Sequence, residues 1–240
     1  MKKPFIYLLT AGLAVSMIVN TNTVDAVGTD SSNATVEFTA PTDTVDPVDP
    51  ENPENPNTEI TPEDGNNTAQ VGPLSLDYIS NIDFGSHDIS TSSETHATTT
   101  SEPYIQVTDR RGTGEGWNVQ AVANSFISDG ENTLPGSTIS FLNGGTNSTS
   151  TTAAPVLNPN IELSTGGDAV NVVTAAAREV DGPISSAQGL GTWVASWLTS
   201  YAPDSEVSLD IPEAAASPGT HTAVIDWILT AGPEASTPGE

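Results

Sequence analysis

The chain has 240 residues, no cysteine and a formal net charge of −26, because 31 acidic residues outnumber 5 lysines and arginines. This charge excludes binding to nucleic-acid phosphates by counterion release, which needs several Lys or Arg contacts. The missing cysteine excludes a disulfide framework and a cysteine nucleophile. The length allows one domain or two small ones, and the poor core-forming composition of the first quarter favours one.

Residues 1–26 have the three parts of a secretory signal peptide. Lys2 and Lys3 precede an apolar run over residues 5–19, and residues 24–26 offer a small-residue cleavage site. The apolar run is too short to favour a stable membrane span. We therefore expect a secreted, extracellular protein with no membrane span after cleavage. Three arginines and thirty acidic residues would remain in it.

Two segments precede the region that can fold. In the N-terminal segment 27–40, residues 34–39 (Ala-Thr-Val-Glu-Phe-Thr) are a lone strand candidate, either an edge strand of the domain or without regular structure. Residues 41–70 hold six prolines and eight acidic residues, with no lysine, arginine or aromatic residue. A proline recurs every three residues from Pro47 to Pro56, which is the repeat of polyproline II. We predict a disordered, extended Pro/Asp/Glu-rich spacer.

Residues 71–240 consist of short alternating runs separated by Gly, Asn, Ser and Thr. Runs with apolar residues on one face occur at 74–78, 82–84, 104–108, 116–123, 138–142, 156–163, 170–174, 206–211 and around Trp227. This texture predicts an all-β fold, an antiparallel β-sandwich of about nine short strands with long loops. Because the chain has no cysteine to form disulfides, the stability of this fold must come from packing alone.

Two segments fit a strand pattern poorly. Residues 175–180 and 192–199 could each form a short helix, since Trp193 and Trp197 have i, i+4 spacing. The alternative for the second is a strand or bent loop that buries both indoles. We favour a covering loop or short helix over one end of the sandwich.

Signals for catalysis, metals or cofactors are thin. The three histidines, His87, His96 and His221, have no metal-ligand spacing, and no Gly-x-Ser-x-Gly elbow or twelve-residue calcium loop occurs. Many carboxylate pairs exist, but nothing singles one out for glycoside hydrolysis. The sequence predicts no catalytic residue, no metal site and no cofactor, and its acidic residues are interpreted as a solvated face.

Two Trp-led strands and an arginine pair are the candidate functional residues. Trp117 shares a strand face with Val119, and Trp227 shares one with Leu229. These indoles either anchor the core or stack on a sugar, and the alternation favours the core. Arg110 and Arg111 precede a Gly-rich turn. They could bind a carboxylate or phosphate of a ligand, or tie down neighbouring acidic residues.

Two regions of the chain resemble the two signature regions of WxL-domain surface proteins of low-GC Gram-positive bacteria. They are Val107-Thr-Asp-Arg-Arg-Gly-Thr-Gly-Glu-Gly-Trp-Asn-Val119 and Ala223-Val-Ile-Asp-Trp-Ile-Leu-Thr-Ala-Gly-Pro233. The first departs from the signature, because Val119 stands where leucine would complete Trp-x-Leu. Just before the second region, His221 stands at a position where many members of the family have tyrosine. The resemblance implies a cell-wall-binding domain over residues 71–240, non-covalent association with peptidoglycan or associated wall polymers, and partner surface proteins of the same system.

We therefore expect a non-catalytic surface protein that attaches to the wall without a covalent link. No Leu-Pro-x-Thr-Gly anchor is present in the chain. Two alternatives remain: an adhesin or complex subunit that binds host matrix proteins or a partner surface protein, and, less favoured, a cell-wall hydrolase. If the tryptophans hold the core together, the binding surface lies elsewhere, on the loops around Arg110 and Arg111 or around Trp193 and Trp197.

Overall fold

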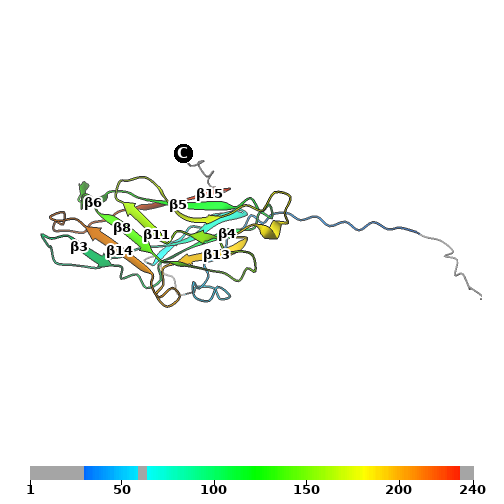
Figure 1. Cartoon of the computed structure of the whole chain (residues 1–240), viewed down its shortest axis with the longest axis horizontal. Coiled ribbons are helices and arrows are strands. Elements are labelled where there is room, and N and C mark those ends of the chain that lie inside the picture. Colours follow the sequence, from blue (N-terminus) through cyan, green and yellow to red (C-terminus); the bar gives the residue numbers. More distant parts are fainter. Residues whose placement is uncertain (1–29, 59–63, 233–240) are drawn as a thin grey trace, which may run out of the picture. The chain divides into compact units, whose positions relative to one another are not determined.

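A computed structural model of the chain describes residues 30–58 and 64–232 (Figure 1). The predicted signal peptide, residues 1–26, lies outside them. The chain divides into two compact units, Met1–Phe38 and Thr39–Glu240. In the first unit, residues 30–38 form neither helix nor strand. The strand candidate at residues 34–39 is therefore without regular structure, which is the second of its two alternatives.

In its described residues, the second unit has fifteen strands, and every pairing between them is antiparallel. A five-stranded sheet has the order β1 (Gly65–Asn67), β2 (Leu74–Ser80), β4 (Tyr104–Asp109), β13 (Gly191–Ser196), β9 (Gly145–Asn147). A second sheet has the order β10 (Val156–Leu157), β12 (Val170–Ala175), β5 (Trp117–Ala123), β15 (Ile225–Ala231). A third has the order β11 (Asn160–Ser164), β8 (Thr138–Leu142), β14 (Glu206–Ile211), β3 (Glu94–Ala97), and β6 (Phe126–Ser128) pairs with β7 (Glu131–Thr133).

The all-β antiparallel fold confirms the predicted class, but the strands are more numerous than the nine expected. The additional strands are mostly two to four residues long, too short to show alternation. The β6–β7 hairpin turns at Asp129 and Gly130, which both have positive φ angles, 51° and 84°. Asp-Gly is the dipeptide that such a two-residue turn favours. The predicted strand at 82–84 does not form.

One predicted strand, residues 156–163, is divided between two sheets. β10 ends at Leu157, and β11 begins at Asn160 beside β8. Between them Pro159 has no N–H for a ladder, and Asn158 Oδ1 accepts a hydrogen bond from the backbone N of Asn160 at 3.1 Å. This local turn lets the chain leave one sheet and enter the next.

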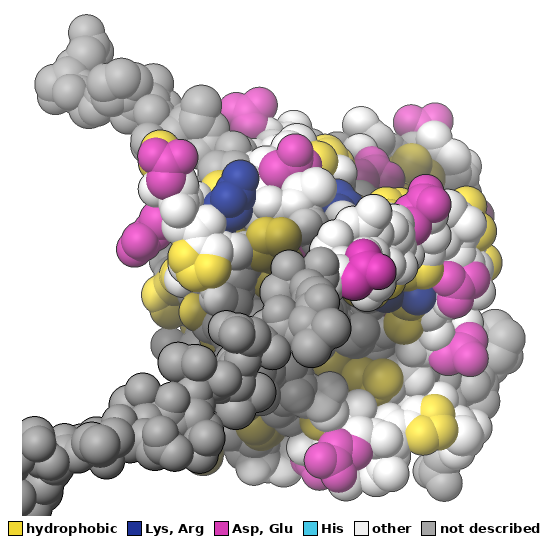
Figure 2. Space-filling view, turned by 90° about the vertical axis from the view of Figure 1, so that its right-hand side faces the viewer, with side chains coloured by type: hydrophobic (Ala, Val, Ile, Leu, Met, Phe, Trp, Pro, Cys, Tyr) yellow, Lys and Arg dark blue, Asp and Glu magenta, His cyan; other side chains and the backbone are white. Residues whose placement is uncertain are grey.

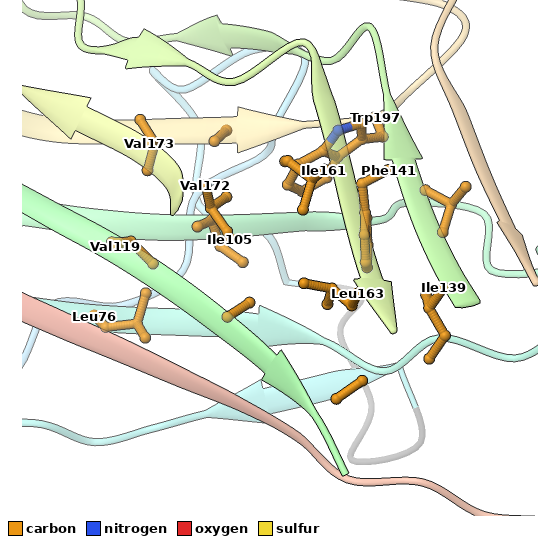
Figure 3. Close-up of a cluster of buried hydrophobic side chains, with 14 of the residues drawn as sticks. Leu76, Ile105, Val119, Ile139, Phe141, Ile161, Leu163, Val172, Val173 and Trp197 are labelled. Carbon is orange, nitrogen blue, oxygen red and sulfur yellow. The ribbon is translucent and has the colours of Figure 1, made fainter. Parts of the chain in front are cut away.

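The three large sheets share one hydrophobic core (Figure 3). Leu76 and Ile105 come from the five-stranded sheet, and Val119 from the second sheet. Phe141 and Ile161 come from the third, and all five side chains are at most 1% exposed. Core contributions from facing sheets define the sandwich that the alternating runs predicted.

Residues 191–196 form β13, so the predicted covering loop or short helix at 192–199 is wrong. β13 lies between β4 and β9, with Trp193 and Ala195 opposite Val107 and Ile105 of the core face. The i, i+4 spacing of the two tryptophans fits a helix, but two neighbouring strands supply ladder hydrogen bonds that a helix would lose. The possible helix at 175–180 does not form either: Ala175 ends β12, and residues 176–179 have no regular structure.

Part of the predicted disordered spacer is folded, which corrects the prediction for residues 43–57 and 64–70. Asp49 N donates to Asn55 O at 2.9 Å and Asn57 N to Pro47 O at 3.0 Å, so the chain reverses instead of extending as polyproline II. Residues 65–67 form β1. We call residues 43–57 the spacer loop.

The spacer loop covers the outer face of the five-stranded sheet. Val48 N donates to Gln106 Oε1 at 2.7 Å, and Gln106 Nε2 donates to Asp46 O at 3.1 Å. Val48 also packs on a second apolar cluster, formed by Tyr78, Tyr104, Val194 and Leu198. An acidic, proline-rich composition alone suggests disorder. The loop is nevertheless held in place, because the buried side-chain amide of Gln106 bonds to its backbone.

Beneath the loop lies a buried carboxyl group, Asp77, at the β-bulge in the β2–β4 pairing. It accepts hydrogen bonds from Ser75 at 2.5 Å, from Thr108 at 2.6 Å and from Gln106 at 3.0 Å. Burial nevertheless raises the pKa of Asp77, because desolvation outweighs the three donors, which lower it. Burial therefore opposes ionisation of Asp77, while the three hydrogen-bond donors support it.

Candidate functional site

All three arginines of the described residues gather at one end of the sandwich. Loop 110–116 joins β4 to β5, and loop 176–190 joins β12 to β13. Because β12 pairs with β5 and β13 pairs with β4, both loops emerge at the same end. Arg178 N donates to Gly114 O at 2.7 Å, which joins the loops directly. We call these two loops the arginine end.

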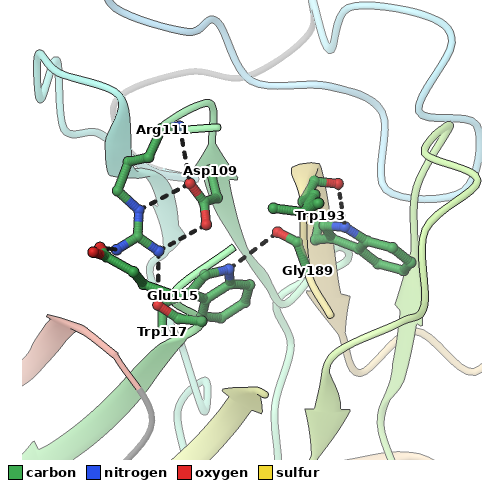
Figure 4. A network of polar contacts seen from close by, with 8 residues as sticks. Asp109, Arg111, Glu115, Trp117, Gly189 and Trp193 are labelled. Atoms are coloured by element: carbon green, nitrogen blue, oxygen red, sulfur yellow. Dashed lines mark hydrogen bonds and ion pairs between the residues drawn. The ribbon is translucent and has the colours of Figure 1, made fainter. Parts of the chain in front are cut away.

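Arg111 is committed to neighbouring acidic residues (Figure 4). Its Nε and Nη2 donate to the two oxygens of Asp109 at 2.9 and 2.7 Å, its Nη2 also donates to Gly116 O at 2.7 Å, and its Nη1 donates to Glu115 at 3.2 Å. The Asp109 side chain is 0% exposed and the Arg111 side chain 10%. The hydrogen bonds that Arg111 donates to Asp109 raise the pKa of Arg111. This bidentate pair fixes the Gly-rich turn, which is the structural alternative considered for Arg111.

Arg110 and Arg178 are more open. Arg110 Nη2 donates to the backbone oxygen of Asp43 at 2.7 Å, which ties the start of the spacer loop to the arginine end. Arg178 is exposed and donates through Nη1 to Gly182 O at 2.9 Å. Exposed apolar side chains follow it in the same loop, Val180 at 94% and Ile184 at 44%. Cationic and apolar groups are thus offered to solvent together.

Two glycines make the arginine end possible. A Cβ at Gly116 would lie 2.3 Å from Ala175 O, and one at Gly189 would lie 2.8 Å from Trp117 Nε1. Both residues have positive φ, 74° and 68°. Trp117 Nε1 donates to Gly189 O at 3.0 Å, so the buried indole is paired (Figure 4). Larger residues would push the two loops apart.

The two Trp-led strands lie side by side, although 110 residues separate their tryptophans. β15 pairs with β5 so that Leu229 stands opposite Val119 and Trp227 opposite Ala121. Trp117 is 1% exposed and Val119 is fully buried. Trp227 and Leu229 are half-buried and pack on the same core, where Trp227 meets Phe141 with ring centroids 6.0 Å apart. The Trp117 indole has no face open for a sugar, and these four residues form a packing seam.

Trp193 and Trp197 are also buried, at 6% and 3% exposed. Trp193 Nε1 donates to Leu190 O at 3.0 Å. Trp197 follows β13 and stacks at a tilt on Phe141, with centroids 4.9 Å apart. Neither indole is presented to a ligand in this structure. Of the predicted binding candidates, Arg110 is the one that combines partial exposure with a cationic group.

The three histidines make local contacts. His87 stacks on His96 with ring centroids 3.7 Å apart, while His221 contacts Thr133 Oγ1 and Ser217 O. In the part of the chain that the structure describes, no three His, Cys, Asp or Glu side chains come close enough to hold a metal ion. The same residues include no helix with the length and apolarity needed to cross a membrane.

Acidic side chains surround the few cations. Figure 2 shows one face on which dark blue arginine side chains stand among magenta carboxylates. With a net charge of −26, most charged side chains repel anions, and the arginines are the permanent cations among the described residues that could attract a carboxylate or phosphate.

Fold and site together define an all-β antiparallel domain whose tryptophans pack in or against its core. The chain matches the family model of the WxL domain, a surface cell wall-binding domain, over residues 25–233, and it belongs to that family. No curated protein and no solved structure matches it. The family confirms the resemblance found in the two Trp regions. The chain is thus a cell-surface protein that binds the cell wall, and the match takes in the spacer loop as well as the strands.

Sequence reasoning did not single out Arg178 or Gly189 as parts of the site. Both lie far along the chain from Arg110. The pairing of β4 with β13 and of β5 with β12 is what brings the two loops together. The scarcity of cations was the sequence signal that could have pointed to Arg178, because the chain has three arginines and Arg178 is the third.

Proposed function

We propose that the protein attaches non-covalently to peptidoglycan through the arginine end and has no catalytic role. The observation that carries this proposal is the gathering of the three arginines of the described residues beside exposed Val180 and Ile184. Peptide stems of a wall carry carboxylates, for which a guanidinium is a planar, two-pronged partner. Sugar rings and stem methyl groups offer apolar faces to the aliphatic side chains.

Burial of the tryptophans supports placing the ligand at the loops. Trp117, Trp193 and Trp197 are at most 6% exposed, so none can stack on a sugar without unpacking the core. A site on loops held by a rigid sandwich is a common arrangement for binding proteins.

Retention by purified peptidoglycan tests the proposal. Arg178→Gln and Val180→Ser should each lower retention by roughly two- to fivefold, since each removes an exposed contact of about 0.5–1 kcal/mol. Val224→Ser is the matched control for the second variant, because Val224 is also exposed, at 58%, and its backbone oxygen bonds to Asn124 N at the other end of β5. Equal retention of all variants would move the site away from the arginine end.

Two further measurements separate the alternatives. Binding to host matrix proteins that persists without wall material would favour an adhesin. Clearing of peptidoglycan in a zymogram would favour a hydrolase and contradict a non-catalytic role.

A further inference from the structure

The sheet β10-β12-β5-β15 ends in a long open edge. β15 pairs with β5, and within the described ranges 30–58 and 64–232 no other strand pairs with its far side. Val224 O accepts from Asn124 N and Gly232 N donates to Gly116 O, so the even-numbered residues form the hydrogen-bonded pairs with β5. In an antiparallel ladder the backbone groups of Ile225, Trp227 and Leu229 then point away from β5.

This edge lacks most of the features that usually block strand addition, and its one charged residue, Asp226, accepts a hydrogen bond from Asn124 Nδ2 at 2.8 Å. β15 contains neither lysine nor proline, and its seven-residue register with β5 has no bulge. Its inward side chains, Ile225, Trp227 and Leu229, pack on the core but stay only half-buried. A further strand beside β15 would cover their open flanks.

The same chain carries a segment with the pattern of the missing strand. In residues 34–39, which we call the arm, Ala34, Val36 and Phe38 alternate with polar residues, as the apolar residues of β15 do. Val36 and Phe38 are 73% and 88% exposed. The arm has no helix or strand structure, and Figure 1 draws it without an arrow. Six residues span about 20 Å as a strand, which is close to the length of β15.

We propose that the arm of one copy of this chain adds as an edge strand to β15 of a second copy. Main-chain hydrogen bonds would supply affinity, and Val36 and Phe38 would extend the apolar face formed by Trp227 and Leu229. Because each copy carries both an arm and an open edge, two reciprocal additions close a symmetric dimer. The dimer does not depend on wall binding.

Cysteine pairing tests the contact directly, because the chain has no cysteine of its own. The protein secreted by an expressing Gram-positive host is used. A Glu37→Cys variant is mixed with variants carrying Asp226→Cys, Ile228→Cys or Thr230→Cys, whose side chains are exposed on the outer face of β15. Side chains on one face of adjacent strands lie about 5 Å apart, so oxidation should link at least one pair. Glu131→Cys, also exposed but on β7, is the control and should not link.

The oligomeric state provides a second measurement. Val36→Asp with Phe38→Asp should raise the dimer dissociation constant by roughly tenfold or more in sedimentation, because large apolar side chains dominate such contacts. Thr35→Asp with Thr39→Asp adds the same charge to the other face of the arm and should have the smaller effect. Equal effects of the two variants would overturn the proposed orientation of the arm.

Two other outcomes would overturn the proposal. A disulfide formed only within a chain that carries both cysteines, at dilutions where mixed chains do not link, would show the arm folding back on its own sheet. A wild-type protein that sediments as a monomer at all concentrations would exclude the second copy.

Discussion

At the scale of single residues, Arg111 and Arg178 are expected to act differently although both are arginines of the arginine end. Arg111→Ala leaves the fully buried Asp109 carboxylate without its partner. Breaking a buried pair in this way costs about 3–5 kcal/mol of unfolding free energy. Arg178→Ala removes an exposed side chain and should change it by less than about 0.5 kcal/mol. Denaturant unfolding of both variants checks this, and similar losses would contradict it.

Asp77 predicts a pH dependence of stability. Burial raises its folded-state pKa above the ordinary value of 3.8. The penalty for ionising it is therefore absent below about that value and is fully present once the pH exceeds the raised folded pKa. The Asp77→Asn variant cannot titrate at this position. The difference between its unfolding free energy and that of the wild type should therefore shift in favour of the variant as the pH rises from 3 to 7. A difference that stays constant over this range would contradict the prediction.

At the scale of elements, the spacer loop is expected to be a structural part of the domain. Val48→Asp would place a charge in the cluster with Tyr78 and Tyr104. The loop should then detach, lose about 1–3 kcal/mol of stabilisation and become sensitive to a protease that cleaves after Glu51 or Glu54. The same substitution at exposed Val156 is the control. Cleavage at equal rates in the two variants would show a loop that was never docked.

Local patterns predicted those elements whose inner face is apolar. β4, β5, β8 and β14 were recognised because alternation of buried and polar side chains is visible in the sequence itself. β13 was misinterpreted because Trp193 and Trp197 also fit a helix, and only its neighbours β4 and β9 decide the structure. The docked spacer loop depends on Gln106, which lies 58 residues after Val48, and no local pattern could show that contact.

At the scale of the whole molecule, the alternating runs predicted the class of fold and the two Trp regions predicted the family, while the assembly of the site needed tertiary structure. Arg110 and Arg111 were candidates because cations are scarce in this chain. Arg110 stays partly open and Arg111 is committed to Asp109, because the folded chain brings different acidic residues near each of them. Likewise, the Trp-led strands identified the family, but only their pairing shows that they form one seam.

The net charge of −26 predicts how wall binding responds to pH and salt. Wall polymers are also anionic, so repulsion opposes the contact at pH 7 and should ease as carboxylates begin to protonate towards pH 5. Retention by purified peptidoglycan should therefore rise over this range. Added salt at pH 7 should raise it too, because it screens repulsion between separated charges.

Below about pH 4 the trend should reverse, since the wall carboxylates that Arg178 would bind lose their charge. Glu131→Gln, on β7, removes one negative charge away from the arginine end and should leave the shape of the profile unchanged. Arg178→Gln should flatten the fall at low pH. Retention that is constant or weaker from pH 7 to 5, with no response to salt, would show that charge repulsion does not govern this attachment.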